Sequence, residues 1–241
     1  MINKEQWKPT TIVRAADDNG FVLNKNAVYP GSVHIASIQW NAYKPVLEKY
    51  ATGKLLDCGC GRIPYHDVVK SNVSLHYCID RNDDVAVAQF LDENIDLNSS
   101  FVLLANDFDS VLMTDVIAHI RYPAQLIKTV ADHMAVSGNL ILTTPFIYWM
   151  SGYPNEYFHP SEFALRSMCE DAGLEIVHLE SYGGRADVLL DTLNKGMTSG
   201  LSHRFFLLLA SVLKKSNWYR RTNEKSRYSY ALGYTLVARK V

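Results

Sequence analysis

The chain has 241 residues, 48% of them hydrophobic, and a formal net charge of −1 at neutral pH. This length and apolar content suffice to build one sizeable core, or a core with an added cap. The near-neutral charge excludes a protein whose main task is to coat nucleic acid or an acidic membrane.

The charge is distributed unevenly along the chain. From Gly196 onward there are nine Lys and Arg residues and a single acid, Glu224, so this end carries +8 and residues 1–195 carry −9. A basic end on an acidic body suggests an anionic partner there, and a solvated helix face is the alternative of equal weight.

The sequence also predicts the cellular compartment. The N-terminus lacks the apolar segment of a signal peptide, and the longest apolar run, residues 205–213, is far shorter than the roughly 20 residues of a membrane-spanning helix. The four cysteines are too sparse for a secreted disulfide scaffold. We therefore expect a reduced, cytoplasmic protein.

The first 51 residues predict a lead-in to the core. Residues 1–33 are punctuated by proline and glycine, and we expect them to be irregular. Residues 34–51 have apolar side chains at helical spacing, but Pro45 should kink this helix or start a new segment.

After Gly53 short apolar runs alternate with helical patterns. We expect strands at 54–58, 75–80, 108–115, 139–145, 174–181 and 230–240, and helices at 65–71, 84–93, 123–136 and 160–173. Gly138 and Gly173 stand where two of these helices should end. The alternation predicts an α/β fold with a mostly parallel sheet covered by helices on both faces. Ligands of such sheets bind at the carboxyl ends of the strands.

Polar residues follow the first two of these strands. The first strand ends in Asp57, which can accept from a cationic or amide group, and Gly59 and Gly61 allow a ligand to approach the backbone closely. The second strand ends in Asp80, 23 residues after Asp57, which suits an acid that binds both ribose hydroxyls of an adenosine.

The remaining candidate residues come later in the chain. Asp96, in the stretch "DLN", offers a carboxylate to an adenine amino group, and Thr114, Asp115 and His119 lie at the end of the following strand or just after it. Each acid alone is better explained as a helix N-cap, and Gly-x-Gly alone is a weak signal. Their combination, in order and in a strand–helix–strand context, is a strong one.

The cysteines of "CGC" have a separate explanation. Cys58 and Cys60 lack the two-residue spacer of a redox or zinc motif, and no second Cys/His pair follows nearby. We interpret them as small packing residues.

Five segments together resemble the class I S-adenosylmethionine-dependent methyltransferases: "LLDCGCG", "YCID", "DLN", "FDSVLMTDVIAHI" and "GNLILTTPF". The resemblance covers residues 53–182 and implies a Rossmann-like fold with an antiparallel last strand and S-adenosyl-L-methionine as cofactor. It adds Cys60, Arg81 and Leu97 to the cofactor-binding residues. Its closest branch, to judge from "GCG-x-x-PY" and residues 159–184, contains bacterial surface-polysaccharide and natural-product enzymes.

The chain departs from this family at two positions. Ala118 replaces a Glu that often precedes the histidine, which weakens any argument for a charged pair there. Ile63 stands where many members have a third glycine. Gly59-x-Gly61-x-x-Pro64 is therefore no dinucleotide fingerprint, which argues against a nicotinamide cofactor.

The resemblance implies methyl transfer to a nucleophile, and a hydroxyl acceptor must lose its proton as the new bond forms. His119 and His159 are the two candidate bases, and local hydrogen bonding or helix capping is the alternative for each. We expect a further set of residues to shape the acceptor pocket: Tyr153, Glu156, Tyr157 and Arg185.

The predicted organisation has three parts. Residues 1–52 form an N-terminal cap with a lead-in helix, residues 53–183 and 230–241 form the cofactor-binding core, and residues 184–229 form an inserted helical cap. Within this insert, residues 202–221 predict one amphipathic helix with a cationic end. It should cover the pocket, form a homodimer face, or make peripheral membrane contact through residues 201–221.

The predicted function is O-methylation of a sugar or glycan hydroxyl, with an acceptor that can be anionic. Methylation of another small molecule or natural product, at oxygen or nitrogen, is the second candidate. A non-catalytic scaffold with the same fold is the third, and the acids at Asp57, Asp80 and Asp96 argue against it.

Overall fold

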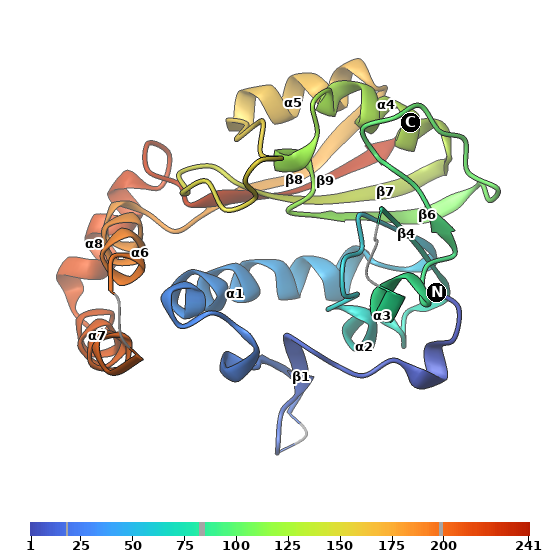
Figure 1. Cartoon of the computed structure of the whole chain (residues 1–241). Helices are drawn as coiled ribbons and strands as arrows, with labels where there is room; N and C mark the ends of the chain where they lie inside the picture. The colour runs from blue at the N-terminus through green and yellow to red at the C-terminus, as the bar shows by residue number, and fades with distance from the viewer. Residues whose placement is uncertain (18, 82–84, 198–199) are drawn as a thin grey trace.

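The computed structural model describes residues 1–17, 19–81, 85–197 and 200–241 (Figure 1). The strands are β1 Ile12–Arg14, β2 Phe21–Leu23, β3 Gly53–Cys58, β4 Val73–Asp80, β5 Glu93–Asn94, β6 Phe108–Thr114, β7 Met134–Pro145, β8 Leu174–Tyr182 and β9 Gly233–Lys240. The α-helices are α1 Val33–Tyr50, α2 His66–Val69, α3 Val85–Ala88, α4 Pro123–Asp132, α5 Glu162–Asp171, α6 Arg185–Lys195, α7 Gly200–Leu213 and α8 Asn217–Ser226. Four short 3₁₀ turns are η1 Lys4–Gln6, η2 Lys25–Ala27, η3 Pro30–Ser32 and η4 Ile117–His119.

Seven of the described strands form one sheet in the order β5-β4-β3-β6-β7-β9-β8. The neighbours from β5 to β7 pair in parallel, whereas β9 runs antiparallel to both β7 and β8. Strand order reverses beside β3, which places a ligand crevice at the carboxyl ends of β3, β4 and β6. The predicted Rossmann-like fold with an antiparallel last strand is confirmed.

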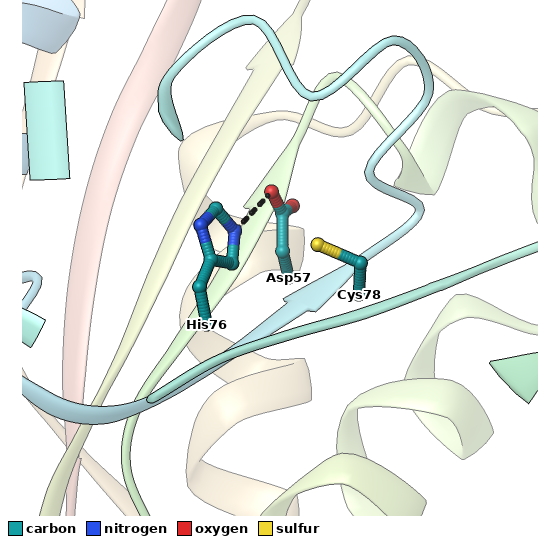
Figure 2. A group of neighbouring side chains, drawn as sticks. All are labelled: Asp57, His76 and Cys78. Carbon is teal, nitrogen blue, oxygen red and sulfur yellow. Dashed lines mark hydrogen bonds and ion pairs between the residues drawn. The ribbon is translucent and has the colours of Figure 1, made fainter. Parts of the chain in front are cut away.

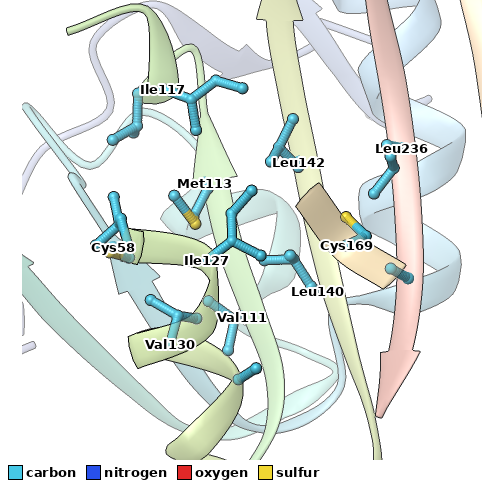
Figure 3. Packing of buried hydrophobic residues seen from close by; sticks show 14 of the residues in the cluster. Cys58, Val111, Met113, Ile117, Ile127, Val130, Leu140, Leu142, Cys169 and Leu236 are labelled. Carbon is cyan, nitrogen blue, oxygen red and sulfur yellow. The ribbon is translucent and has the colours of Figure 1, made fainter. Parts of the chain in front are cut away.

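Helices cover both faces of this sheet (Figure 1). Helices α4 and α5 bury apolar side chains against one face, and Figure 3 shows this core, with Ile127 and Val130 of α4 and Cys169 of α5 over residues of β6, β7 and β9. On the other face α1 and α2 form a second core with the inner residues of β3, β6, β7 and β9. The alternation along β3 explains the two cores, since Leu55 faces α1 while Leu56 and Cys58 face α4.

Helix α1 runs without interruption through Pro45, so the expected start of a new segment there is wrong, while a kink stays a prediction. A proline inside a helix costs about 3 kcal/mol because a hydrogen bond is lost and the ring crowds the preceding turn. Apolar side chains on both sides of Pro45, such as Tyr43 and Leu47, are 1% exposed. Their burial against the sheet offsets the cost.

The segment 123–136 is not one helix, and the prediction that Gly138 ends it is also wrong. Helix α4 ends at Asp132 and β7 already begins at Met134. The register of β6 with β7 shifts at this point, and a Cβ on Gly138 would lie 2.8 Å from the carbonyl oxygen of Phe108. Gly138 is therefore required by the close approach of two strands. The second expected helix end is confirmed, because Gly173 follows α5 with a φ of +74°.

Two further local predictions need correction. The region 1–33, which we expected to be irregular because of its Gly and Pro residues, contains an antiparallel hairpin, β1–β2. The expected helix 84–93 is confined to α3 and is followed by the short strand β5, while Asp84 lies outside the described residues.

The late insert contains three described helices, which lie beside the start of α1 (Figure 1). Among them, α6 packs against η3, α1, α7 and α8. The expected single helix over 202–221 is wrong, because the Ser216 side chain accepts from Tyr219 N at 3.1 Å and starts α8 as a separate helix. None of the helices in the described ranges is long and apolar enough to cross a bilayer. The three-part division of the chain stays a prediction.

Candidate functional site

The turn after β3 is built from left-handed residues. Gly59 and Gly61 have φ values of +77° and +52°, and their neighbour Ile63 has +53°. Gly59 N donates to Ile79 O at 2.8 Å, which fixes the turn against β4. A Cβ on Gly59 would lie 2.6 Å from a methyl of Val116, so the chain has room only for glycine there.

Ile63 is therefore the third left-handed position of the turn. A β-branched side chain at positive φ is strained, typically by about 1–2 kcal/mol. Ile63 is fully buried with Cys60, Cys78 and Leu91, so its packing offsets that strain. Ile63 thus keeps the left-handed backbone conformation that a glycine would adopt freely, and it adds apolar contacts in place of the flexibility of glycine.

A cavity of about 430 Å³ opens at the carboxyl ends of β3, β4 and β6. Its size is within the usual range of small-ligand pockets. Nine predicted site residues line it: Gly59, Asp80, Arg81, Asp96, Leu97, Thr114, Asp115, His119 and Tyr157. The sheet topology gathers these residues from segments up to 98 positions apart at one edge.

Other predicted residues lie outside this lining. Asp57 is 2% exposed and pairs with His76 at 3.0 Å, and Cys60 is buried beneath the turn. Gly61 contacts the site indirectly, because its N–H donates to Asp80 Oδ2 at 2.7 Å. The role of each residue toward a cofactor stays a prediction.

Four predicted catalytic or acceptor-pocket residues also lie elsewhere. His159 Nε2 contacts Glu156 Oε1 at 2.5 Å, and Glu156 Oε2 accepts from Gly152 N at 2.6 Å. This pair holds the loop after β7 together. Tyr153 is 83% exposed. Arg185 belongs to α6, and its guanidinium lies 4.6 Å from the centre of the Tyr230 ring.

The acids of the cavity differ in environment. Burial raises the pKa of the Asp80 carboxyl, and the hydrogen bond from Gly61 N partly opposes this. Asp96 is more exposed and pairs with the Arg81 guanidinium at 3.1 Å. Two carboxylates beside Gly59, where no Cβ fits, suit an adenosine, whose ribose and amino groups are hydrogen-bond donors.

Asp115 holds a strained position at the end of β6. Its φ is +57°, its N–H donates to Thr143 O at 2.9 Å, and its Oδ1 accepts from the Tyr43 hydroxyl at 2.7 Å. Burial raises the pKa of this carboxyl, and the Tyr43 hydrogen bond opposes the rise. Strained residues held by surrounding contacts are concentrated at functional sites.

His119 faces the cavity with a defined tautomer. Its Nδ1 lies 2.9 Å from the carbonyl oxygen of Asn155, and because a carbonyl can only accept, Nδ1 must carry the proton. In the neutral ring Nε2 then has the lone pair. Gly152 packs against the ring, where a Cβ would lie 2.3 Å from Cε1.

Sequence reasoning missed several residues of the cavity. Arg121 lines it and donates to the Tyr157 hydroxyl at 3.2 Å, and Asn98 Nδ2 donates to the His119 carbonyl at 3.1 Å. Asn98 stands directly after Leu97 and Arg121 two positions after His119, so proximity to predicted residues was the available signal. Asn155 stands directly before Glu156, but no sequence signal shows that it acts through its backbone carbonyl in the folded loop.

Comparisons with known proteins agree with this geometry. The family model described as a methyltransferase domain matches residues 42–179, which is more than half of the chain. No curated protein matches the chain. Among solved structures, the S-adenosylmethionine-dependent methyltransferase from Mesorhizobium loti is similar, with a TM-score of 0.55 at 12% identity over 86% of this chain and 100% of that one.

Two further structures have the same fold. The SAM-dependent methyltransferase from Archaeoglobus fulgidus has a TM-score of 0.52 at 17% identity, over 88% of this chain and 95% of that one. The [4+2]-cyclase SpnF has a TM-score of 0.51 at 20% identity, over 82% and 80%.

The fold is the one that the solved S-adenosylmethionine-dependent methyltransferases have, which is the class that the sequence predicted. Within this class the chain belongs to the family described by the methyltransferase-domain model.

Proposed function

We propose that the protein methylates a hydroxyl group of a sugar or glycan, and that the cavity holds S-adenosylmethionine beside this acceptor. The observation that carries the proposal is His119, which lines the cavity and, with its proton on Nδ1, has a lone pair on Nε2. The sugar assignment is supported by the resemblance of "GCG-x-x-PY" and of residues 159–184 to enzymes of surface polysaccharides.

The cofactor would lie across the carboxyl ends of β3 and β4. Gly59 would allow close approach of the backbone, Asp80 would bind the ribose hydroxyls, and Asp96 with Leu97 would hold the adenine. When bound, S-adenosylmethionine supplies an electrophilic methyl group on a good leaving group. The contribution of the protein is then mainly alignment of the acceptor and exclusion of water.

His119 would act as the general base. The Asn155 carbonyl keeps the proton on Nδ1, so Nε2 is available to take the acceptor proton as the methyl bond forms. His159 has a different role in this proposal, since its contact with Glu156 holds the loop that carries Tyr157.

Arg121 supports an acceptor that carries a negative charge. Its guanidinium lies 5.4 Å from the centre of the Tyr157 ring, at the rim of the cavity, and Arg81, the other arginine of the lining, is already paired with Asp96. A guanidinium binds phosphate or carboxylate oxygens well. A nucleotide sugar or phosphorylated glycan fits this arrangement.

The outer face of α7 supports the predicted peripheral membrane contact. Its apolar residues Leu201, Phe205, Leu208 and Val212 are each at least 63% exposed and follow helical spacing. A stripe of this kind beside Lys214 and Lys215 is typical of helices that lie on an anionic surface.

The test is a panel of nucleotide sugars and glycans incubated with radiolabelled S-adenosylmethionine. We expect a labelled sugar product, and His119→Ala should reduce its rate by about 10²–10⁴-fold, the usual contribution of a general base. His159→Ala is the comparison variant: it loosens the loop but keeps the base, so it should lower the rate far less than His119→Ala.

Two outcomes would contradict the proposal. Labelling of a non-sugar acceptor would favour the second candidate, a methyltransferase of another small molecule. Absence of any affinity for S-adenosylmethionine or its demethylated product would favour the non-catalytic scaffold.

A further inference from the structure

Three metal-ligating side chains are buried together beneath the glycine turn (Figure 2). His76 and Cys78 are two positions apart on β4 and so point to the same face of the sheet. The parallel register pairs Asp57 with Cys78 and Leu55 with His76, so Asp57 on β3 faces the same side. The pairing of the strands thus gathers residues that the sequence separates.

Their donor atoms are already close to the geometry of a coordination sphere. One carboxylate oxygen of Asp57, one ring nitrogen of His76 and the Cys78 sulfur all lie within 4.8 Å of one another, with Nε2 3.0 Å from Oδ2. Ligands at the usual zinc distances of about 2.0–2.3 Å are roughly 3.3–3.8 Å apart in a tetrahedron. Only small adjustments of these distances would therefore be needed. The three residues are at most 6% exposed.

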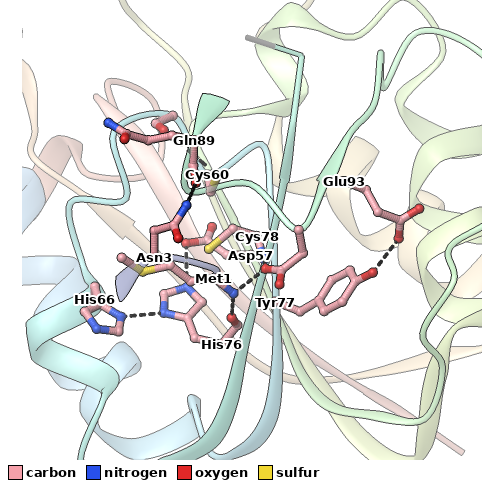
Figure 4. A network of polar contacts seen from close by, with 12 residues as sticks. Met1, Asn3, Asp57, Cys60, His66, His76, Tyr77, Cys78, Gln89 and Glu93 are labelled. Carbon is pink, nitrogen blue, oxygen red and sulfur yellow. Dashed lines mark hydrogen bonds and ion pairs between the residues drawn. The ribbon is translucent and has the colours of Figure 1, made fainter. Parts of the chain in front are cut away.

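A fourth donor comes from the turn itself. Cys60 packs with Cys78 in one buried cluster and is 3% exposed (Figure 4). Two sulfurs, one imidazole nitrogen and one carboxylate oxygen form a donor set that suits zinc. The cavity used for the cofactor lies above the turn, and Asp57 and Cys60 are absent from its lining.

The orientation of His76 provides independent support. Its Nδ1 lies 3.0 Å from His66 Nδ1, so the ring is held with Nε2 directed at Asp57 (Figure 4). Histidines that bind metals characteristically use one ring nitrogen while the other is fixed by an outer hydrogen bond. His66 provides this outer contact.

We propose that Cys60, His76, Cys78 and Asp57 form a closed structural site for one Zn²⁺ ion. The site takes no part in methyl transfer and does not depend on the identity of the acceptor. The ion would join β3, β4 and the glycine turn, and because the site is closed it would bind as the chain folds.

The experiment measures metal content in the full-length chain, purified without a metal-binding tag from zinc-supplemented cells. We expect about one zinc per chain by elemental analysis, and Cys78→Ala should lower this below about 0.1. Cys58→Ala is the matched control, because Cys58 is equally buried but faces the opposite core. It should keep the zinc.

A measurement on the unaltered protein guards against a variant that fails to fold. X-ray absorption at the zinc edge should show about two sulfur neighbours and two lighter ones. Folded protein without zinc, zinc retained by folded Cys78→Ala, or a zinc environment without sulfur would each overturn the proposal.

Discussion

The cofactor edge of the sheet and the inserted cap use polar residues in opposite ways. At the edge, Asp80, Asp96 and Asp115 line a cavity and so remain available to a ligand. In the cap, Asp187 is 3% exposed and binds other helices, while the apolar Leu208 is 63% exposed. The edge is a binding surface built on a rigid scaffold, whereas the cap is held by internal polar contacts and shows apolar residues outward.

The largest effect should come from the glycine turn. Gly59→Ala places a Cβ 2.6 Å from Val116 at a φ of +77°, so the turn must shift away from its ligand geometry. We expect affinity for S-adenosylmethionine, measured by calorimetry, to fall at least about 100-fold, which corresponds to roughly 2.7 kcal/mol. Gly173→Ala is the control, with a φ of +74° and open space. It should cost about 1 kcal/mol of stability and leave affinity unchanged. Equal affinity in both variants would contradict the role of the turn.

The cap should be the region most sensitive to loss of one buried carboxylate. Asp187 on α6 accepts from the Tyr219 hydroxyl and, at 2.8 Å, from Asn223 Nδ2, which ties α6 to α8. Asp187→Ala leaves both donors without their partner and should lower the free energy of unfolding by about 2–4 kcal/mol in urea denaturation. Leu189→Ala, an exposed change on the same helix, should stay within about 0.5 kcal/mol. A small effect of Asp187→Ala would show that the cap does not depend on this contact.

Asp115 should make the stability of the protein depend on pH. Because burial raises its pKa above the unfolded value, its contribution to stability is present at low pH and is lost as pH rises through the folded pKa. An asparagine at position 115 does not ionise, so it removes this loss of stability, and it tolerates the positive φ. Asp115→Asn should therefore raise the melting temperature on the order of 2–4 °C at neutral pH, with a smaller gain at pH 4. A gain that grows toward acid would contradict this sign.

The smallest effect on stability should be on the outer face of α7. Leu208→Gln should change the free energy of unfolding by no more than about 0.5 kcal/mol, since the side chain is largely exposed. It should weaken co-sedimentation with vesicles of phosphatidylglycerol and phosphatidylcholine if α7 binds an anionic surface. Val136→Gln, equally apolar and 75% exposed on β7, is the control. Identical vesicle binding in both variants would contradict membrane contact through α7.

Much of the cofactor edge was predictable because local rules determine it. Turn glycines and acids at strand ends occur at fixed offsets from apolar runs, so Gly59, Asp80 and Asp96 could be named without coordinates. The residues that were missed or misplaced depend on nonlocal contacts. Asp57 turns away from the cavity because its partner His76 stands on the next strand, and Asn155 acts through a carbonyl that only the folded loop directs at His119.

The sequence by itself determined the alternation of strands and helices, the glycine turn and hence the class of cofactor, because these follow from periodicity and backbone preference over a few residues. The tertiary structure alone decided that Pro45 stays helical, that Gly138 lies in a strand, and that Ile63 adopts a positive φ. In each case the free energy of packing against distant residues exceeds the local preference, and no short stretch of sequence contains that sum.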